Sequence, residues 1–451
     1  QEVEHLGVRV LLSCQVSKIE PSCGMYRVSS SQGILEADAL ILATGSKAAP
    51  STGSDGSGYE LAKSLGHRVI KPLPALVQLR CQGSMYKQMA GIRTEAKVSL
   101  YAESPRLNKS GKGAERILLA EDRGELQLTD YGLSGIPVFQ VSRFGARALD
   151  EGSKVVARVD FMPSWKEEEA FGLLRKRASH MDYKTVEEMF VGLLNKKLAL
   201  VLIRLAGVDP SMKSGGLSPR QLGRLLEQIK SYEAIVMSVN PFANAQVCCG
   251  GVDVHEVDAN TMESKVRKGL YLAGELLDVD GICGGYNLQF AWSSGAIAGK
   301  CAAGKRGCRK DACGKETLMI RINQIKLPLG HDRQDLPAKV SGILGIPAGE
   351  IDSLHIIKQS VDARKKPDIL YSYVVDVAVR GITGKKEEKL VRKLRGRDVS
   401  VQDSLGYRLP EPGTQELARP PVVIGTGPAG LFCGLLLARK GYRPILLERG
   451  E

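Results

Sequence analysis

The sequence contains no pair of cysteines separated by two residues, although it has 10 cysteines among 451 residues. Such pairs are the usual signature of structural zinc, so we expect no metal site. No run of about 18 consecutive apolar residues occurs, which argues against a transmembrane helix. Residues 1–5 are polar and acidic, unlike a signal peptide. These absences together predict a cytoplasmic protein with reduced thiols.

Composition sets only broad limits on function. Apolar residues make up 43% of the chain and charged residues 25%, which is typical of a globular protein and excludes disorder as its main state. The length predicts about three domains. Lys and Arg number 63 against 50 Asp and Glu, a net charge of +13. This excess suits an anionic cofactor or a nucleic acid, but it does not select between them.

The first 71 residues have the pattern of an incomplete α/β domain. Residues 26–28 and 34–36 predict a hairpin, and the unbroken apolar run at 39–43 is typical of a strand buried on both faces of a parallel sheet. A similar pattern returns at residue 250 and continues to residue 304. We therefore assign residues 1–71 and 250–304 to one Rossmann-like domain of the α/β class.

Residues 72–249 have a different pattern, which predicts an inserted domain. Short β-rich segments separated by turn residues indicate a small β-barrel or sandwich. These segments lie at residues 98–101, 117–120, 125–128, 138–141 and 155–159. Capping boxes that begin at Ser164, Thr185 and Ser218 then predict three helices. The insert is thus a barrel followed by helices.

Two linkers divide the rest of the chain. Residues 305–318 are basic and aperiodic, and we interpret them as a linker. Residues 319–409 predict a small α+β domain with a basic helix at 385–394. A second linker, rich in proline, leads into residues 419–451, which predict a partial Rossmann unit of the β-α-β type.

The strongest motif is the G-x-G-x-x-G pattern at residues 425–430, between a predicted strand and a predicted helix. Gly425 would make the tight turn, Gly427 would let the backbone approach a pyrophosphate, and Gly430 would let the helix pack on the strand. The helix N-terminus would offer free amides to the phosphates. Glu448, at the end of the next strand, is placed to bind ribose hydroxyls. The motif predicts FAD or NAD rather than NADP, because an acidic residue disfavours a 2′-phosphate.

Several stretches of the first 300 residues carry a family resemblance. They are ATG at 43–45, GELQLTDYGLSG at 124–135, LAGELLDVDG at 272–281 and GGYNLQ at 284–289. Over residues 5–300 the chain resembles the BaiN/RdsA-like, aminoacetone-oxidase-like family of FAD-dependent oxidoreductases. The resemblance implies an FAD-binding, Rossmann-like sheet that is interrupted by the inserted domain.

The resemblance also implies which residues contact FAD. Thr44 and Gly45 would approach the cofactor backbone. The loop at 274–280 would lie along the ribityl chain and the pyrophosphate, and the helix that starts near residue 285 would direct its amides at the flavin. The residues implied in this loop and helix are Gly274, Glu275, Asp278, Asp280, Gly284, Gly285 and Asn287. Ordinary turn formation is the alternative for the two aspartates.

The chain departs from the family pattern at both ends. No Gly-rich strand-turn-helix precedes Gln1, and residues 319–451 resemble the N-terminal part of a second FAD-dependent dehydrogenase. The sequence therefore predicts a truncated tandem of two flavoproteins with two incomplete nucleotide sites. A circular permutation is the weaker alternative, because joining the ends would leave out residues that the family has. We expect such a chain to hold FAD poorly unless its halves dock.

The predicted function is an FAD-dependent oxidoreductase acting on a small organic substrate, with NAD(P)H as a candidate electron donor. No catalytic residue is identified, since His67, His180 and His255 have the pattern of core or surface histidines.

An RNA-associated flavoprotein and a noncatalytic dinucleotide-binding fragment are the alternatives. The basic run at 385–397 motivates RNA, but no aromatic residues interleave with it. We therefore expect neither a nucleic acid nor a membrane as partner, and the oligomeric state is not predicted.

Overall fold

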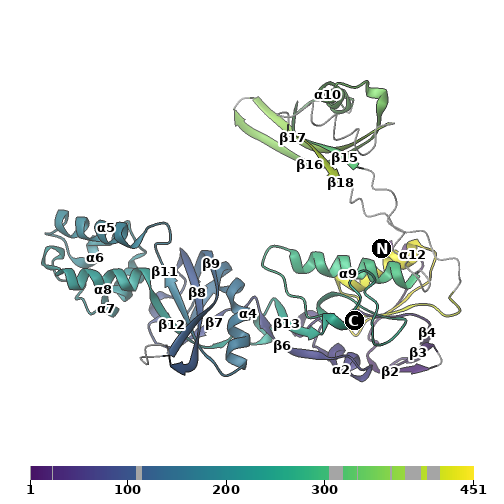
Figure 1. Ribbon diagram of the computed structural model, residues 1–451, viewed down its shortest axis with the longest axis horizontal. Helices are drawn as coiled ribbons and strands as arrows, with labels where there is room; N and C mark the ends of the chain where they lie inside the picture. Colours follow the sequence, from purple (N-terminus) through teal and green to yellow (C-terminus); the bar gives the residue numbers. More distant parts are fainter. Residues whose placement is uncertain are drawn as a thin grey trace. The chain divides into compact units, whose positions relative to one another are not determined.

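The computed structural model describes residues 2–22, 24–107, 114–303, 318–332, 334–365, 368–380, 398–403 and 417–450 (Figure 1). The chain forms two compact units, one of Gln1–Arg306 with Glu411–Glu451 and the other of Gly307–Pro410. The basic helix predicted at 385–394 lies outside the described residues, as do most of both predicted linkers.

Five short parallel strands form the central sheet of the first unit, in the order β1, β20, β19, β5 and β14. Their bounds are Arg9–Leu11, Ile445–Leu447, Val422–Ile424, Leu40–Leu42 and Leu270–Leu272. Every residue of the last four strands is buried. Burial on both faces explains why these strands are short apolar runs without alternation.

The end of the chain completes the sheet that the start of the chain begins. Strand β19 pairs with β5 through Val422 and Leu40, and β20 pairs with β1 through Ile445 and Arg9. The expectation of two separate incomplete sites is therefore wrong for this structure. Its physical reason is that the backbone N–H and C=O groups of the buried strands β19 and β20 need partners on both sides, and β5 and β1 provide the outer ones. The tandem origin of the chain stays a prediction.

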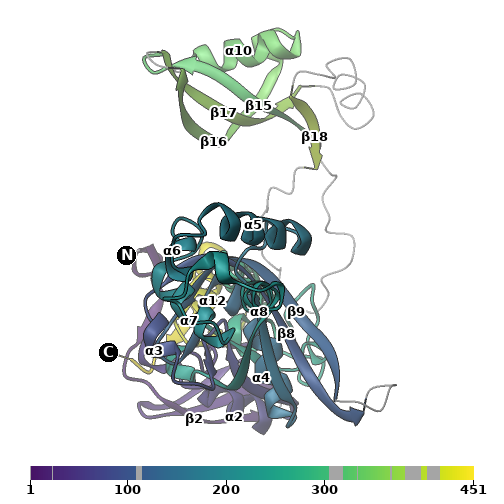
Figure 2. The same ribbon diagram turned by 90° about the vertical axis from the view of Figure 1, so that its left-hand side faces the viewer.

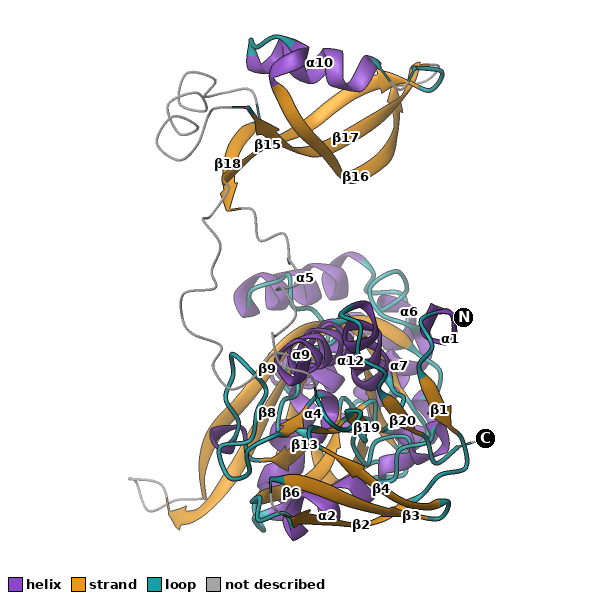
Figure 3. Cartoon of the chain, turned by 90° about the vertical axis from the view of Figure 1, so that its right-hand side faces the viewer, coloured by secondary structure: helices purple, strands orange, loops and turns teal. Residues whose placement is uncertain are grey.

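Helices cover one side of this sheet. Figure 3 shows α9, which spans Tyr286–Ala303, beside α12, which spans Pro428–Arg439, over the central strands. A three-stranded antiparallel sheet of β2 (Val16–Ser22), β3 (Met25–Ser30) and β4 (Gly33–Ala37) and the short helix α2 (Ser57–Ser64) complete the domain. The hairpin predicted at residues 26–28 and 34–36 is the β3–β4 pair.

Two glycines of α9, Gly295 and Gly299, lie directly against the backbone of α12. A Cβ atom on Gly295 would lie 2.1 Å from the carbonyl oxygen of Ala429, and one on Gly299 would lie 2.7 Å from that of Cys433. The two helix backbones therefore touch at these glycines. Beside them, the rings of Trp292 and Phe432 stack with centroids 5.8 Å apart.

The inserted domain contains a closed barrel in the strand order β10, β7, β12, β11, β8, β9. Its strands are β7 (Leu79–Cys81), β8 (Arg93–Leu107), β9 (Ala114–Leu128), β10 (Gly132–Gly135), β11 (Lys154–Asp160) and β12 (Tyr232–Val239). The strand predicted at residues 138–141 is wrong, because these residues belong to helix α4, Ile136–Asp150. Val138, Val141, Gly145 and Ala148 are buried at helical spacing, which a short apolar window does not distinguish from a strand.

Four helices extend the insert, and Figure 2 shows them in front of the barrel. They are α5 (Glu167–His180), α6 (Val186–Met189), α7 (Lys196–Leu205) and α8 (Pro219–Lys230). The capping boxes at Thr185 and Ser218 form as predicted. The one predicted at Ser164 does not, because α5 begins later, after Lys166. The antiparallel pair β6 (Val69–Ala75) and β13 (Val247–Val252) leads into and out of the insert.

The second unit is a four-stranded antiparallel sheet with one described helix. The strand order is β16 (Ile351–Lys365), β17 (Asp368–Val379), β15 (Leu318–Pro328) and β18 (Val399–Asp403). Helix α10 (Asp335–Leu344) places Leu336, Val340 and Leu344 in the core of this unit.

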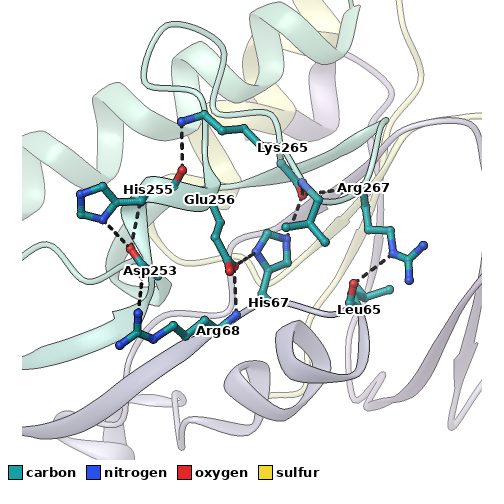
Figure 4. A network of polar contacts seen from close by, with 10 residues as sticks. Leu65, His67, Arg68, Asp253, His255, Glu256, Lys265 and Arg267 are labelled. Atoms are coloured by element: carbon teal, nitrogen blue, oxygen red, sulfur yellow. Dashed lines mark hydrogen bonds and ion pairs between the residues drawn. The ribbon is translucent and has the colours of Figure 1, made fainter.

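A buried histidine fastens the end of α2 to the loop that precedes β14 (Figure 4). His67 Nδ1 lies 2.9 Å from Glu256 Oε2, and its Nε2 lies 2.9 Å from Ser264 Oγ. Ser264 Oγ also accepts from the amides of Val266 and Arg267, so its own hydrogen is donated to His67 Nε2. Nδ1 then donates to Glu256, and both ring nitrogens have a partner.

The other two histidines that the sequence suggested are on the surface. The side chain of His255 is 90% exposed and pairs with Asp253, and His180 is exposed at the end of α5. His67, His180 and His255 are all absent from the wall of the cavity at the edge of the central sheet.

We predict that Gly295→Ala lowers the stability of the first unit by about 1–3 kcal/mol, because the new methyl group meets the backbone of α12. Gly172→Ala, on α5 where no atom lies within 4 Å of the added Cβ, should instead be neutral or stabilising by up to about 1 kcal/mol. Urea unfolding followed by Trp292 fluorescence in a Trp165→Phe background measures the difference. Equal effects would contradict the helix contact.

We also predict that His67→Leu lowers the free energy of unfolding by about 1–3 kcal/mol, because it leaves buried partners unpaired. His255→Leu serves as the control and should change that energy by less than about 0.5 kcal/mol, since its side chain is exposed. Urea unfolding followed by circular dichroism tests this, and matching losses in the two variants would show that the network does not stabilise the fold.

Candidate functional site

Two of the three motif glycines are required by the fold itself. Gly425 has φ +99°, and a Cβ there would lie 2.4 Å from the carbonyl oxygen of Ala43. A Cβ on Gly430 would lie 1.9 Å from the carbonyl oxygen of Gly425. The turn after β19 and the first turn of α12 are thus too close to neighbouring backbone for any side chain.

Gly427 differs from these two because nothing in the protein occupies the space beside it. Its φ is −65° and ψ −178°, which any residue adopts, and no atom lies within 4 Å of an added Cβ. It is the N-cap of α12, and no side chain caps the helix there. The first amides of α12 therefore face an open space, which is the arrangement that binds phosphate at helix N-termini.

Glu448 lies directly after β20, beside the same turn. Its Oε2 accepts a hydrogen bond from the amide of Thr426 at 3.1 Å and another from the Thr426 hydroxyl, and its Oε1 accepts from the amide of Gly450 at 2.8 Å. Burial alone would raise the pKa of Glu448, but these hydrogen bonds outweigh burial and hold the pKa below its usual value. The carboxylate is therefore ionised at neutral pH.

A cavity of about 390 Å³ lies at the carboxyl edge of the sheet, in front of this turn. Residues 424–429 and 447–449 from the end of the chain line it, together with residues 14–16, 43–46, 48–49, 52–55 and 274–275 from the first 300 residues. Ligands of open α/β sheets bind at this edge. The two parts of the chain that the sequence analysis treated as separate sites thus line one cavity.

Thr44 and Gly45 lie in the cavity wall, at the end of β5. Thr44 Oγ1 is buried and has no hydrogen-bond partner within the protein. The hydroxyl faces α2, because a Cβ added to Gly58 would lie 1.8 Å from Thr44 Oγ1. Gly45 has φ +73°, and a Cβ there would meet the Ser54 hydroxyl at 2.8 Å.

Gly274 and Glu275 form another part of the wall, at the end of β14. Gly274 has φ +73°, and a Cβ there would lie 2.9 Å from the Cβ of Ala429 in α12. Glu275 Oε2 accepts a 2.9 Å hydrogen bond from Ser46 Oγ. Burial raises the pKa of Glu275, and the bond from Ser46 offsets this only in part.

Asp278 and Asp280 do not line the cavity. Asp278 Oδ1 accepts from the amide of Gly250 at 2.8 Å, and Asp280 Oδ2 lies 2.6 Å from Arg143 Nη1 in α4. Burial raises the pKa of Asp280, against the opposing effect of Arg143 and Arg147. The structure gives both aspartates protein partners, so they are more than turn formers.

Gly284, Gly285 and Asn287 lie where the loop enters α9, also outside the cavity wall. Gly284 and Gly285 have φ +126° and +92°. The side chain of Asn287 closes the loop, because its Oδ1 accepts from the amide of Gly281 at 2.7 Å and its Nδ2 donates to the carbonyl of the same residue. One residue later, Leu288 does line the cavity.

Sequence reasoning missed several parts of the cavity wall, and two of them are placed by contacts with the end of the chain. Residues 14–16 lie there because β1 ends beside β20 and the chain turns at the carboxyl edge, where the amide of Cys14 donates to the carbonyl of Glu448 at 2.7 Å. Asp55 lies there because it pairs with Arg449. Neither segment carries a motif, so only the strand order could have indicated them.

The residues in the cavity wall fit the ADP portion of a dinucleotide. The open amides of α12 suit a pyrophosphate, and the ionised Glu448 suits ribose hydroxyls. Within the described part of the chain, no group of three or more metal-ligating side chains is found. No helix among the described residues is long and apolar enough to cross a membrane.

Comparison with known proteins agrees with this geometry. Residues 1–301 match the HI0933-like protein Rossmann domain, and residues 319–378 match a domain of unknown function, DUF8436. A 3-dehydro-bile acid delta(4,6)-reductase of Clostridium scindens is 42% identical over 305 residues, which cover 67% of this chain and 71% of the relative.

Two other relatives cover different shares of the chain. A ribosomal RNA dihydrouridine synthase of Haemophilus influenzae is 29% identical over 301 residues, which cover 65% of this chain and 68% of that protein. An uncharacterized protein of Clostridium beijerinckii is 42% identical over 134 residues, which cover 30% of this chain but only 24% of that protein.

These findings confirm the resemblance predicted for residues 5–300, the Rossmann-like α/β fold and an enzyme of the oxidoreductase class that binds a flavin-type dinucleotide. The chain belongs to the HI0933-like Rossmann family.

Proposed function

We propose that this chain is an FAD-dependent oxidoreductase that holds FAD in the cavity at the carboxyl edge of its central sheet. The observation that carries the proposal is the convergence of Gly427, Glu448 and Thr44 on one cavity, although the strands that they follow come from opposite ends of the chain. Membership of a family with a flavoprotein-type Rossmann domain supports FAD over NAD as the resident dinucleotide.

Each part of FAD has a partner in this proposal. The pyrophosphate binds the first amides of α12 at Gly427, the adenosine ribose binds Glu448, and the adenine lies toward residues 14–16. The ribityl chain passes Glu275. The flavin ring lies at the start of α9, where the Gly284–Gly285 turn and Asn287 shape the approach. Asp278 and Asp280 do not touch the cofactor in this proposal; they hold the loop in place through Gly250 and Arg143.

FAD, when bound, supplies hydride and electron transfer. The residues of this chain bind and orient it. The N-terminus of α9 favours negative charge on the ring, because the helix dipole has its positive end there. Glu448 stays ionised at neutral pH because its pKa is depressed, so it accepts the ribose hydrogens without first losing a proton.

We further propose a small organic substrate and NAD(P)H as the electron donor. The bile acid reductase relative, at 42% identity over two thirds of this chain, supports a small molecule. The ribosomal RNA dihydrouridine synthase is only 29% identical to this chain, so RNA is the alternative substrate.

The test of FAD binding uses Gly427→Ala. The added methyl group meets no protein atom, so the apoprotein should unfold at the same temperature as the unaltered chain, but the methyl group lies where the pyrophosphate must approach. We expect the unaltered protein to bind one FAD per chain and the variant to lose affinity at least about tenfold, about 1.4 kcal/mol. Flavin fluorescence during titration of the apoprotein measures this.

Gly223→Ala in α8 is the matched control, since an added Cβ there is equally free of contacts. It should bind FAD as the unaltered protein does. Failure of the unaltered chain to bind FAD, or equal affinity of the Gly427→Ala variant, would overturn the proposed site.

The proposed reaction predicts that NADH or NADPH bleaches the flavin absorbance of the loaded protein under anaerobic conditions. A 3-dehydro-bile acid with delta(4,6) double bonds should then restore the absorbance, as the relative's name suggests. Restoration by an RNA oligonucleotide but not by the bile acid would favour the RNA alternative. Absence of any reduction by NADH and NADPH would favour the noncatalytic alternative.

A further inference from the structure

Helix α4 of the inserted domain carries three polar side chains that all reach the loop before α9. They are Gln140, Arg143 and Arg147, and a spacing of three and four residues places them on one face of the helix. Gln140 Oε1 accepts from the amide of Cys283 at 3.1 Å. Arg147 pairs with Asp278 at 3.7 Å. The inserted domain thus contacts residues 278–283 along their length.

Arg143 makes the central contact of this face. Its Nη1 lies 2.6 Å from Asp280 Oδ2 and also donates to the carbonyl oxygen of Asp280. The side chains of Arg143 and Asp280 are 19% and 10% exposed, so the pair is largely removed from water. Removing one partner of such a pair is costly, because it leaves a buried charge without compensation.

Between this contact and α9 the loop contains Gly281, Gly284 and Gly285, which allow its backbone more conformations than other residues would. Side chains therefore hold it in place: Asn287 bonds to the backbone of Gly281, and Gln140 accepts from the amide of Cys283. Arg143 therefore fixes one side of a glycine-rich loop whose other side leads into the first turn of α9. That turn contains Leu288, which lines the cavity.

We propose that Arg143 is a positioning residue through which the inserted domain sets the reduction potential of the bound flavin. It fixes the loop that starts α9 and compensates the negative charge of Asp280 beside it. This inference rests on the proposed function, because it requires the flavin ring at the start of α9. Uncompensated negative charge near a flavin disfavours the anionic reduced form, so loss of Arg143 should make the flavin harder to reduce.

Hydrogen exchange of the apoprotein tests the positioning separately from any cofactor. In Arg143→Met we expect the amides of residues 279–287 to exchange at least about tenfold faster, which is an opening free energy lower by about 1.4 kcal/mol. The control is Arg123→Met, which removes a barrel arginine paired with Glu95 at 2.7 Å. It should leave these amides unchanged. Exchange in Arg143→Met equal to that in the control would overturn the inference.

The potential of bound FAD, measured by equilibration with a reference dye, tests the electrostatic part. Arg143→Met should shift the potential to a more negative value, while Arg143→Lys, which keeps the charge, should restore most of it. Arg123→Met should match the unaltered protein. An unshifted potential in Arg143→Met would contradict the inference while FAD binding stands. Failure of the unaltered chain to bind FAD would instead contradict the proposed function, with the exchange result unaffected.

Discussion

The backbone pairing of β19 and β20 between β5 and β1 is the interaction on which the rest of the structure depends. It joins residues 422–447 to residues 9–42 in one parallel sheet, and it brings the glycine turn, Glu448 and Thr44 to one edge. Without it, β5 would have an unpaired edge, β1 would have no partner in this sheet, and no cavity of this shape would form. The contact of Gly295 and Gly299 with α12 reinforces the same union on the helical side.

The three motif glycines differ in whether the protein itself requires a glycine at that position. Gly425 and Gly430 are fixed by neighbouring backbone, whereas the space beside Gly427 is used by nothing in the protein. Among the three motif glycines, Gly427 is therefore the one whose surroundings leave room for a cofactor. Among the buried polar groups, His67 has both ring nitrogens bonded within the protein and stabilises the fold, while the Thr44 hydroxyl has no partner.

Sequence patterns predicted many local elements of this molecule correctly, but they did not predict which distant segments pair in one sheet. The glycine turn, the buried run of β5 and the capping boxes at Thr185 and Ser218 are set by neighbouring residues, so they could be identified from short windows. The strand predicted at residues 138–141 failed because four residues do not distinguish a helix from a strand. The partners of Asp280, and the wall formed by residues 14–16, depend on contacts between distant segments, for which the sequence carries no local signal.

The pairing of β19 and β20 with strands from the start of the chain is tested most directly by cutting the chain between the two segments. A protease recognition sequence inserted between residues 410 and 411, at the boundary of the second unit, allows the terminal segment to be separated covalently from the small domain. After cleavage, size-exclusion chromatography under native conditions should show the terminal segment eluting together with the rest of the chain, because strands on both sides hold it. Elution of the segment by itself from an otherwise folded chain would contradict the single-sheet account.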